Sequence, residues 1–222
     1  MEKKKILEDL QKEELPKLYE DISGYISSKT LANGNNAKSW KYGYDKKYDL
    51  VIISKTGEIG QIIDINSVKI ALPKEPAFCK KRSSKRSEQY WEPEELPSQL
   101  SKIKTIFQWN AKPLEFQNMW VDYINEQFDR REKGFWFMNN GVKTYITGSH
   151  WMYLQWSNID VGLPDFREAN RIYYIYWEAC KADDRCFGLD YLKIRRSGFS
   201  FMGAAECVNI GTLAKKSRLG MI

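Results

Sequence analysis

The sequence predicts an α/β fold, and three observations support this prediction. Residues 48–72 contain three short apolar runs rich in β-branched residues, which are typical of strands. Residues 113–134 and 164–184 each place apolar side chains at helical spacing. Residues 188–217 have the pattern of a strand, a basic loop and a helix in succession. Strands that alternate with helices are typical of α/β architectures.

The composition indicates a folded, basic protein of 222 residues. Hydrophobic residues make up 42% and aromatic residues 14%, which argues against a largely disordered chain because disordered segments contain few aromatic residues. No run approaches the roughly 20 apolar residues of a membrane span, and the charged N-terminus lacks the apolar core of a signal peptide. The formal net charge of +6 permits a nucleic-acid or phosphate partner.

The cysteines and the single histidine do not form a known zinc motif. Among Cys79, Cys180, Cys186 and Cys207, only Cys180 and Cys186 are close in sequence, and their spacing differs from that of CxxC. We therefore expect reduced thiols in a cytosolic protein. His150 is more simply explained as a packed histidine in an aromatic strand than as a catalytic base, because no nucleophile partner is visible.

Residues 1–97 are predicted to form a small α+β region. Helical periodicity covers residues 2–26, and a polar loop follows at 27–39. Three strands are expected at residues 50–54, 58–65 and 67–72. Gly57 is predicted to turn the chain between the first two strands as a hairpin. The polar and basic residues 73–97 are predicted to be a surface loop or linker.

Residues 98–222 are predicted to form a second part. Helices are expected over residues 113–134, 164–184 and 200–217. Strands are expected on both sides of the Asn140-Gly141 turn, which is typical of a hairpin. Further strands are expected over residues 150–156, 188–194 and 218–222. The aromatic face of the helix at 113–134 is most simply explained as core.

The stretch LKIRRSGFS approximates a phosphate-binding loop, which has the pattern Gly, four residues, Gly, Lys and then Ser or Thr. Gly198 and Ser200 are in register with this pattern, whereas Lys193 stands at the first glycine and Phe199 at the lysine. Glycine allows the backbone to approach phosphate oxygens, and the following helix supplies amide donors. An equally simple alternative is a capped helix start with solvated arginines.

KIRRSGFS resembles the modified Walker A loop of large terminase subunits, the ATPases that package DNA into tailed-phage capsids. In one branch of that family the functional lysine stands at the front of the loop and an aromatic residue takes its usual place. Lys193 and Phe199 match this arrangement. The family's loop arginine, which reaches the terminal phosphate, is matched by Arg195 or Arg196.

A second segment agrees with this resemblance. GSHWMYLQW, at residues 148–156, is similar to the family's aromatic stretch near the adenine side. The similarity covers about residues 113–222 and looks closest to the terminases of crAss-like gut phages. It implies that residues 98–222 are the beginning of a P-loop NTPase core of the ASCE type, with a parallel sheet.

The resemblance also implies an ATP site. The residues that would contact the phosphates are Lys193, Arg195, Arg196, Ser197, Gly198, Phe199 and Ser200. Arg195 or Arg196 would have the catalytic role, and Ser200 would bind the Mg²⁺ ion that accompanies ATP. The candidates for the adenine side are Gln117, Tyr153 and Gln155, although ordinary strand alternation explains the last two slightly better.

The activity implied by the resemblance is ATP-driven translocation of double-stranded DNA into the procapsid, at its portal in the host cytoplasm. The implied partners are the DNA, the portal protein, the small terminase subunit and further copies in a ring, without a membrane. The family's Walker B strand, coupling motif and nuclease domain have no counterpart here. We therefore expect the N-terminal part of a longer ATPase and endonuclease, which does not hydrolyse ATP alone.

Two other functions remain open from the sequence. The chain could be a non-enzymatic DNA-binding or capsid-assembly protein, or it could belong to another P-loop ATPase such as a helicase-like protein. The basic run KKRSSKR, at residues 80–86, fits a solvated loop or a contact with DNA phosphates.

Overall fold

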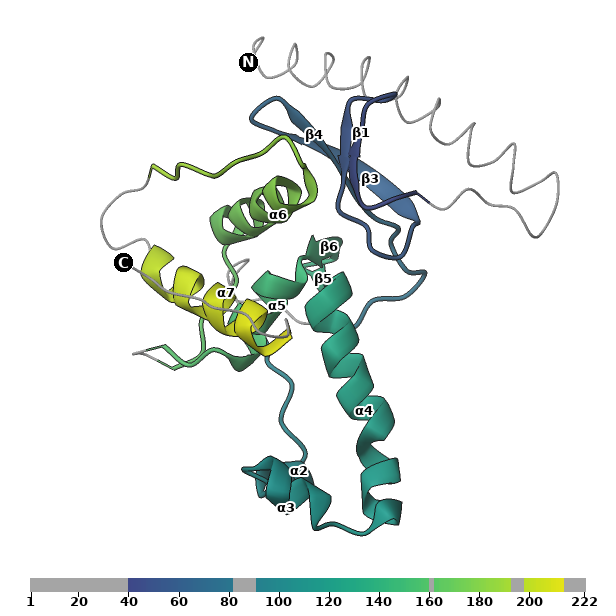
Figure 1. The fold of residues 1–222 in the computed structure, drawn as a ribbon, viewed down its shortest axis with the longest axis vertical. Helices are drawn as coiled ribbons and strands as arrows, with labels where there is room; N and C mark the ends of the chain where they lie inside the picture. Colours follow the sequence, from purple (N-terminus) through teal and green to yellow (C-terminus); the bar gives the residue numbers. More distant parts are fainter. Residues whose placement is uncertain (1–39, 82–90, 160–161, 193–197, 214–222) are drawn as a thin grey trace, which may run out of the picture.

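The computed structural model describes residues 40–81, 91–159, 162–192 and 198–213. The chain forms a four-stranded sheet, a two-stranded hairpin and several helices that pack around them (Figure 1). The predicted mixture of helices and strands is thus confirmed. The elements predicted at residues 2–26, 27–39 and 218–222 lie outside the described residues.

The N-terminal strands are β1 (Gly43–Asp45), β2 (Leu50–Ile52), β3 (Ile59–Ile65) and β4 (Val68–Pro73). They form a mixed sheet in the order β1-β2-β4-β3, in which β4 is parallel to β2 and antiparallel to β3. The hairpin predicted at Gly57 is therefore wrong, because β4 lies between β2 and β3. The hairpin comes one strand later, where Asn66 and Ser67 adopt φ angles of 52° and 63°.

Burial explains why β4 takes a central position. Ile70, Ala71 and Leu72 are all buried, whereas β3 alternates between buried and more exposed positions. A strand that is buried on both faces suits the interior of a sheet, and an alternating strand suits its edge. The sequence contains this difference, but it does not state which strands become neighbours.

Helix α6 (Glu168–Ala182) covers one face of the sheet (Figure 1) and confirms the helix predicted at 164–184. Its Ile175 and Ala179 share a buried cluster with Ile70 and Leu72 of β4. The opposite face of the sheet has its own cluster around Trp40. The helix from the second predicted part therefore completes the core of the first.

Strands β5 (Phe135–Asn139) and β6 (Val142–Ile146) form the predicted hairpin. Asn140 and Gly141 have φ angles of 47° and 87°, as a two-residue turn of this kind requires. Part of the segment predicted as a surface linker belongs to the core, because Trp91 is buried with its ring 5.1 Å from that of Phe137 in β5.

Residues 148–156 form helix α5 (Gly148–Trp156), so the aromatic strand predicted at 150–156 is wrong. Thr147 caps the helix, because its side-chain Oγ1 accepts a hydrogen bond from the backbone N–H of His150 at 3.3 Å. Nearly all residues of α5 are buried. An apolar run that is buried on all sides has no periodicity that separates a helix from a strand.

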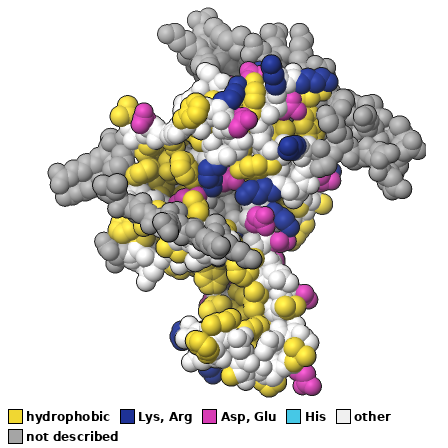
Figure 2. Space-filling view, in the orientation of Figure 1, with side chains coloured by type: hydrophobic (Ala, Val, Ile, Leu, Met, Phe, Trp, Pro, Cys, Tyr) yellow, Lys and Arg dark blue, Asp and Glu magenta, His cyan; other side chains and the backbone are white. Residues whose placement is uncertain are grey.

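Helix α4 (Leu114–Lys133) confirms the predicted helix but not its position in the core, since only Gln127 and Arg130 are buried. Its N-terminal half projects from the body as an arm (Figure 1), with α2 (Ser98–Ser101) and α3 (Ile106–Asn110) at the tip. Helical periodicity identifies the apolar side of a helix but not whether another element covers it. Exposed apolar side chains on this arm (Figure 2) include Ile106, Phe107, Leu114, Met119 and Val121.

Among the described residues, no helix combines the length and the apolar character that crossing a bilayer requires.

Candidate functional site

The helix expected after the phosphate-loop pattern is confirmed as α7 (Phe199–Leu213). Gly198 precedes it with a φ of 80°, and its carbonyl accepts hydrogen bonds from the N–H groups of Phe201 and Met202 at 3.1 and 3.3 Å. This positive φ favours glycine. No atom of the described residues lies within 4 Å of the position that a Cβ would take, so the requirement for glycine at position 198 comes from the backbone conformation.

Only part of the predicted phosphate-binding set can be described. Gly198, Phe199 and Ser200 lie within the described residues, and Ser200 is exposed in the first turn of α7. The first amide groups of a helix have no partner within the helix and are available to a ligand or to water. The rest of the set, which includes all of its basic residues, lies outside the described residues. These residues are Lys193, Arg195, Arg196 and Ser197.

An aromatic stack joins the two sides of the loop. Tyr191, before the loop, stacks on Phe199 with ring centroids 5.0 Å apart and an angle of 19° between the planes. Tyr173 of α6 meets both rings edge-on, at 4.9 Å from Tyr191 and 5.3 Å from Phe199. Burial, and then the charge of Glu206, raises the pKa of Tyr173 to about 12. The stack holds Tyr191 and Phe199 against each other and gives Phe199 a packing role.

The strand predicted at residues 188–194 is wrong over the described residues 188–192, which form no strand. Leu192 is 98% exposed, and Phe187 is fully exposed. A strand needs a neighbour for its backbone hydrogen bonds, and the described ranges provide none at this point. The loop therefore has the expected helix after it but not the expected strand before it.

The three candidates for the adenine side do not converge on one place. Gln155 lies in α5 and uses its amide on the backbone of Glu94: its Oε1 accepts from the N–H at 3.0 Å, and its Nε2 donates to the carbonyl at 2.8 Å. Tyr153 is buried in the core beside it. Gln117 lies at the arm tip, where its Nε2 donates to the carbonyl of Lys112 at 2.9 Å, far from α7 (Figure 1).

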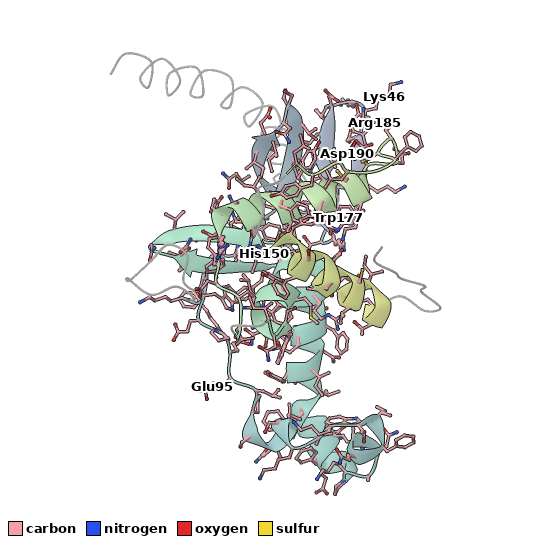
Figure 3. All side chains as sticks on the ribbon, turned by 90° about the vertical axis from the view of Figure 1, so that its left-hand side faces the viewer. Lys46, Glu95, His150, Trp177, Arg185 and Asp190 are labelled. Atoms are coloured by element: carbon pink, nitrogen blue, oxygen red, sulfur yellow. The ribbon has the colours of Figure 1, made fainter. Side chains whose placement is uncertain are left out.

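His150 is a packed histidine, in a helix rather than the expected strand. Its ring lies between those of Tyr174 and Phe166, at 4.9 and 5.8 Å, deep among the helices (Figure 3). Neither ring nitrogen has a hydrogen-bond partner in the part of the chain that the structure describes. Burial, and then the positive charge of Arg171, lowers the pKa of His150 to about 3. The imidazole is therefore neutral at physiological pH and is a structural group.

The low pKa of His150 predicts acid sensitivity. As the pH falls below 6.5, the unfolded chain binds a proton at His150 and the folded chain does not, so stability is lost towards the folded pKa of about 3. Between about pH 6.5 and 5 this costs the wild type about 2 kcal/mol, at ~1.4 kcal/mol per pH unit. We expect His150→Phe, which keeps a ring between Tyr174 and Phe166, to lose about 2 kcal/mol less on acidification. Urea unfolding of both proteins across this range measures the difference, and parallel pH profiles would contradict the assignment.

A charged network joins α6 to α7, and its two carboxylates are buried whereas its lysines are partly exposed. Lys181 lies between two carboxylates, with its Nζ 2.7 Å from Glu178 Oε2 and 2.9 Å from Glu206 Oε1. Lys55, after β2, reaches Glu178 Oε1 at 3.2 Å. The indole N–H of Trp177, which faces α7 (Figure 3), donates to Glu206 Oε1 at 3.0 Å. The helix after the loop is thus linked to the N-terminal sheet.

The charges in this network depend on one another. Burial alone would raise the pKa of Glu178, but Lys181 and Lys55 outweigh burial and hold that pKa below its usual value. Burial alone would lower the pKa of Lys181, but Glu178 and Glu206 raise it. An adjacent pocket of about 390 Å³ is lined by both basic and acidic side chains, so the charge of its lining favours neither an anion nor a cation. The charged residues of this lining are Lys55, Arg131, Lys181, Glu132 and Glu178.

A second polar contact fixes α7 against the ends of α4 and α5. Arg131 Nε donates to Asn209 Oδ1 at 3.1 Å, and Asn209 Nδ2 donates to Ser149 Oγ at 3.3 Å. Sequence reasoning missed this group and the network around Glu206. The available signal was the presence of Glu206 and Asn209 within the otherwise apolar sequence of α7, because buried polar residues usually have specific partners.

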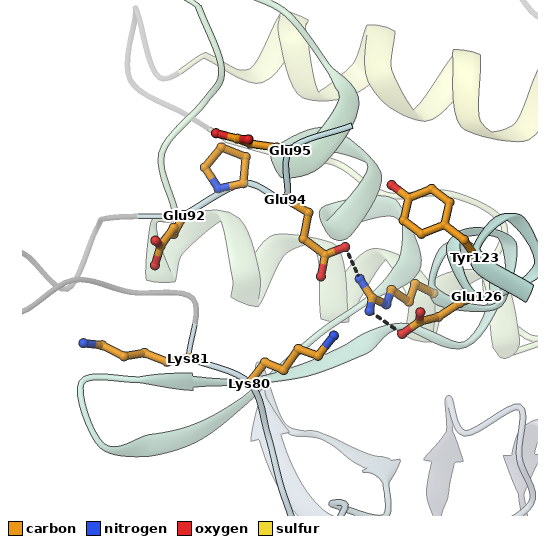
Figure 4. A pocket seen from close by; sticks show the side chains of 9 residues that line it. Lys80, Lys81, Glu92, Glu94, Glu95, Tyr123 and Glu126 are labelled. Atoms are coloured by element: carbon orange, nitrogen blue, oxygen red, sulfur yellow. Dashed lines mark hydrogen bonds and ion pairs between the residues drawn. The ribbon is translucent and has the colours of Figure 1, made fainter. Parts of the chain in front are cut away.

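The start of the basic run at 80–86 faces carboxylates. Lys80 and Lys81 line a pocket of about 470 Å³ (Figure 4). In the same pocket, Arg130 pairs with Glu94, whose Oε2 lies 2.7 Å from its guanidinium, and with Glu126. The lining contains four glutamates, Glu92, Glu94, Glu95 and Glu126. The four glutamates therefore offset the positive charge of Lys80, Lys81 and Arg130 in this lining. The remaining residues 82–86 lie outside the described part of the chain.

The described side chains offer little to a metal ion on their own. Within the described ranges, no group of three or more His, Cys, Asp and Glu residues could hold one. Ser200 is compatible with the more limited role of one Mg²⁺ ligand, because it is exposed in the first turn of α7 and the other ligands of such an ion come from the nucleotide and water. Comparisons with models of protein families, with curated proteins and with solved structures found no match for this chain.

Proposed function

We propose that this chain carries the nucleotide-binding loop of a DNA-packaging motor, the large terminase subunit of a tailed phage. The observation that carries the proposal is Gly198, which has a φ of 80° directly before a 15-residue helix, as a phosphate loop of this register needs. The stack of Tyr191 on Phe199 supports it, because it accounts for an aromatic residue at the usual lysine position.

In this proposal the loop binds the phosphates of ATP with Mg²⁺. Lys193 and one of Arg195 and Arg196 neutralise phosphate charge, and the first amides of α7 donate to phosphate oxygens. Ser200 contributes its hydroxyl to the Mg²⁺ ion. ATP supplies the phosphoanhydride bond whose hydrolysis drives the movement of double-stranded DNA.

The remaining parts of the proposal concern the longer protein. A complete motor would add a Walker B strand and a nuclease, and would work as a ring at the procapsid portal in the host cytoplasm, with the small terminase subunit. A P-loop NTPase core of the ASCE type belongs to the same proposal. The described residues 188–192 form no strand, and this observation favours the second candidate, a non-enzymatic DNA-binding or capsid-assembly protein.

Nucleotide binding separates the two candidates. We expect the chain to bind a fluorescent ATP analogue in the presence of Mg²⁺, and Lys193→Ala to weaken binding about tenfold through the loss of one charge-assisted contact, ~1.4 kcal/mol. Ser200→Ala should lower the dependence of binding on Mg²⁺. We expect no ATP hydrolysis by the chain alone.

Lys102→Ala is the matched control, because it removes a lysine charge after α2, at the arm tip. This variant should bind the analogue as the wild type does. A wild-type chain that does not bind the analogue, or equal weakening by Lys102→Ala and Lys193→Ala, would contradict the nucleotide site and favour the second candidate.

A further inference from the structure

One side of helix α4 is exposed and repeats its character every seven residues. The side chains of Leu114, Val121 and Phe128 are 70%, 43% and 48% exposed. Asn118 and Asn125 lie between them along the helix and are exposed as well. Seven residues are close to two helical turns, so these five side chains form one line, which we call the α4 stripe. The stripe runs along the arm from its tip towards the body (Figure 1).

The stripe lies away from the side on which α4 packs. The buried residues of α4 are Gln127 and Arg130. Val121 lies about 120° from Gln127 around the helix axis, because each residue turns an α-helix by about 100°. Arg131 covers part of the Phe128 ring, with its guanidinium 5.5 Å from the ring centroid, and marks the end of the stripe at the body. The rest of the chain therefore leaves the stripe open to a partner.

The spacing within the stripe is that of a coiled coil. Its residues alternate steps of four and three, which places Asn118 and Asn125 at heptad positions a, and the three apolar residues at positions d. Apolar residues at d provide the contact between two helices. Asparagine at a fixes the register and the number of strands, at a cost in stability. The stripe thus has the pattern of a helix that pairs with another helix.

The charge of the arm narrows the choice of partner. Residues 114–129 of α4 contain four acidic residues and no basic one. Such a surface repels the phosphates of nucleic acids and of anionic lipids. A second copy of the helix needs no opposite charge, because identical positions of the two stripes complement each other. Leucine meets leucine, and each asparagine amide offers both a donor and an acceptor to the other.

We propose that the α4 stripe is a contact between two copies of this chain, which pair their arms as a short, parallel, two-stranded coiled coil. Helix α4 is already formed in each copy, so the pairing does not have to nucleate a helix. The two copies use the same surface patch, as in most symmetric dimers.

The parallel direction follows from the polar residues. Parallel helices bring Asn118 beside the partner's Asn118, and Val121 beside the partner's Val121. In an antiparallel pair, position a packs against position d, so each asparagine would face an apolar side chain. Antiparallel packing would also place Glu115, at position e, beside the partner's Asp122, at the same heptad position. Like charges and mismatched polarity therefore disfavour it.

Sedimentation equilibrium over a range of micromolar concentrations tests the contact. We expect a reversible dimer of the wild-type chain. Val121→Asp should weaken it by about tenfold or more, because it buries a charge at the centre of the stripe. Met119→Asp is the matched control, since Met119 is 65% exposed on α4 but lies on the other side of the helix. The control should dimerise as the wild type does, and circular dichroism checks that both variants keep their helices.

The asparagines provide a second readout. Asn125→Val should tighten the dimer by about tenfold, because it removes a polar pair from an a position. A residue that is exposed in solution and has no role in association would not change the dissociation constant in this way.

A cysteine crosslink tests the direction of the helices. In a glutathione redox buffer, Asn118→Cys should form a disulfide-linked dimer, because identical core positions of parallel helices lie close enough for this bond. Met119→Cys should not do so, and both variants carry the same native cysteines.

The pairing does not rest on the proposed nucleotide site, because the stripe contains no residue of that loop. Lys193→Ala should therefore dimerise as the wild type does, whatever its effect on nucleotide binding. A wild-type chain that stays monomeric, or equal weakening by Val121→Asp and Met119→Asp, would overturn the proposal. Crosslinking of Met119→Cys as readily as Asn118→Cys would do the same.

Discussion

Replacement of Lys181 by methionine is expected to lower the free energy of unfolding by about 3–5 kcal/mol. Lys181 is the ammonium group that Glu178 and Glu206 share, at 2.7 and 2.9 Å. Both glutamates are more than nine-tenths buried, and Glu206 Oε2 has no partner among the described residues even in the wild type. Within the described ranges, removal of the cation leaves Lys55 to compensate Glu178 and the Trp177 indole to bind Glu206. An uncompensated buried charge costs more than the pair contributes.

Denaturant unfolding at neutral pH measures this effect. Lys133→Met is the matched control, because Lys133 makes an exposed pair with Asp129 and such pairs contribute about 0–1 kcal/mol. Adding Glu206→Gln to Lys181→Met should recover part of the loss, since it removes one buried charge. If Lys181→Met and Lys133→Met lower the free energy of unfolding by the same amount, the network does not contribute to stability as its geometry indicates.

The elements that the sequence predicted correctly have local signals. The β5–β6 hairpin depends on Asn140 and Gly141, whose left-handed backbone is a property of those two residues. Helices α6 and α7 carry apolar periodicity or a glycine at their start, and these signals act within a few residues. Predictions of this kind need no knowledge of what packs against the element.

The incorrect predictions concern partners that are distant in sequence. β4 inserts between β2 and β3 because α6, more than 90 residues later, covers the face that Ile70 and Leu72 present. Helix α5 is buried on nearly all sides, so its apolar run could have been a strand. The segment at 188–192 has strand-like residues, but within the described ranges it has no neighbouring strand.

In the candidate site, too, the sequence predicted the local features but not those that depend on residues distant in sequence. The register of Gly198 and Ser200 was readable from sequence, and the helix that follows them is present. The role of Phe199 was not readable, because its partners Tyr173 and Tyr191 come from α6 and from the approach to the loop. Gln155 was a candidate for the adenine side, whereas its amide pairs with the Glu94 backbone 61 residues earlier.

Gly148→Ala is expected to destabilise the chain by about 3 kcal/mol or more. Gly148 begins α5 where that helix meets the end of α4, and a Cβ on it would overlap the backbone carbonyl of Arg131. A backbone carbonyl cannot rotate away as a side chain can, so α4 and α5 would have to separate. Their separation would also disturb the contact from Arg131 through Asn209 to Ser149, which holds α7.

Thermal unfolding of Gly148→Ala against Gly188→Ala tests this close approach. Gly188 has open space where a Cβ would be and lies outside the helices. Its replacement should therefore leave stability unchanged or raise it by up to about 1 kcal/mol through the unfolded state. If Gly148→Ala did not lower the melting temperature relative to Gly188→Ala, the two helices would not approach as closely as the Gly148–Arg131 contact requires. The packing of α7 would then need another explanation, because α5 contributes side chains to the buried core and also contacts α7 through the hydrogen bond between Ser149 and Asn209.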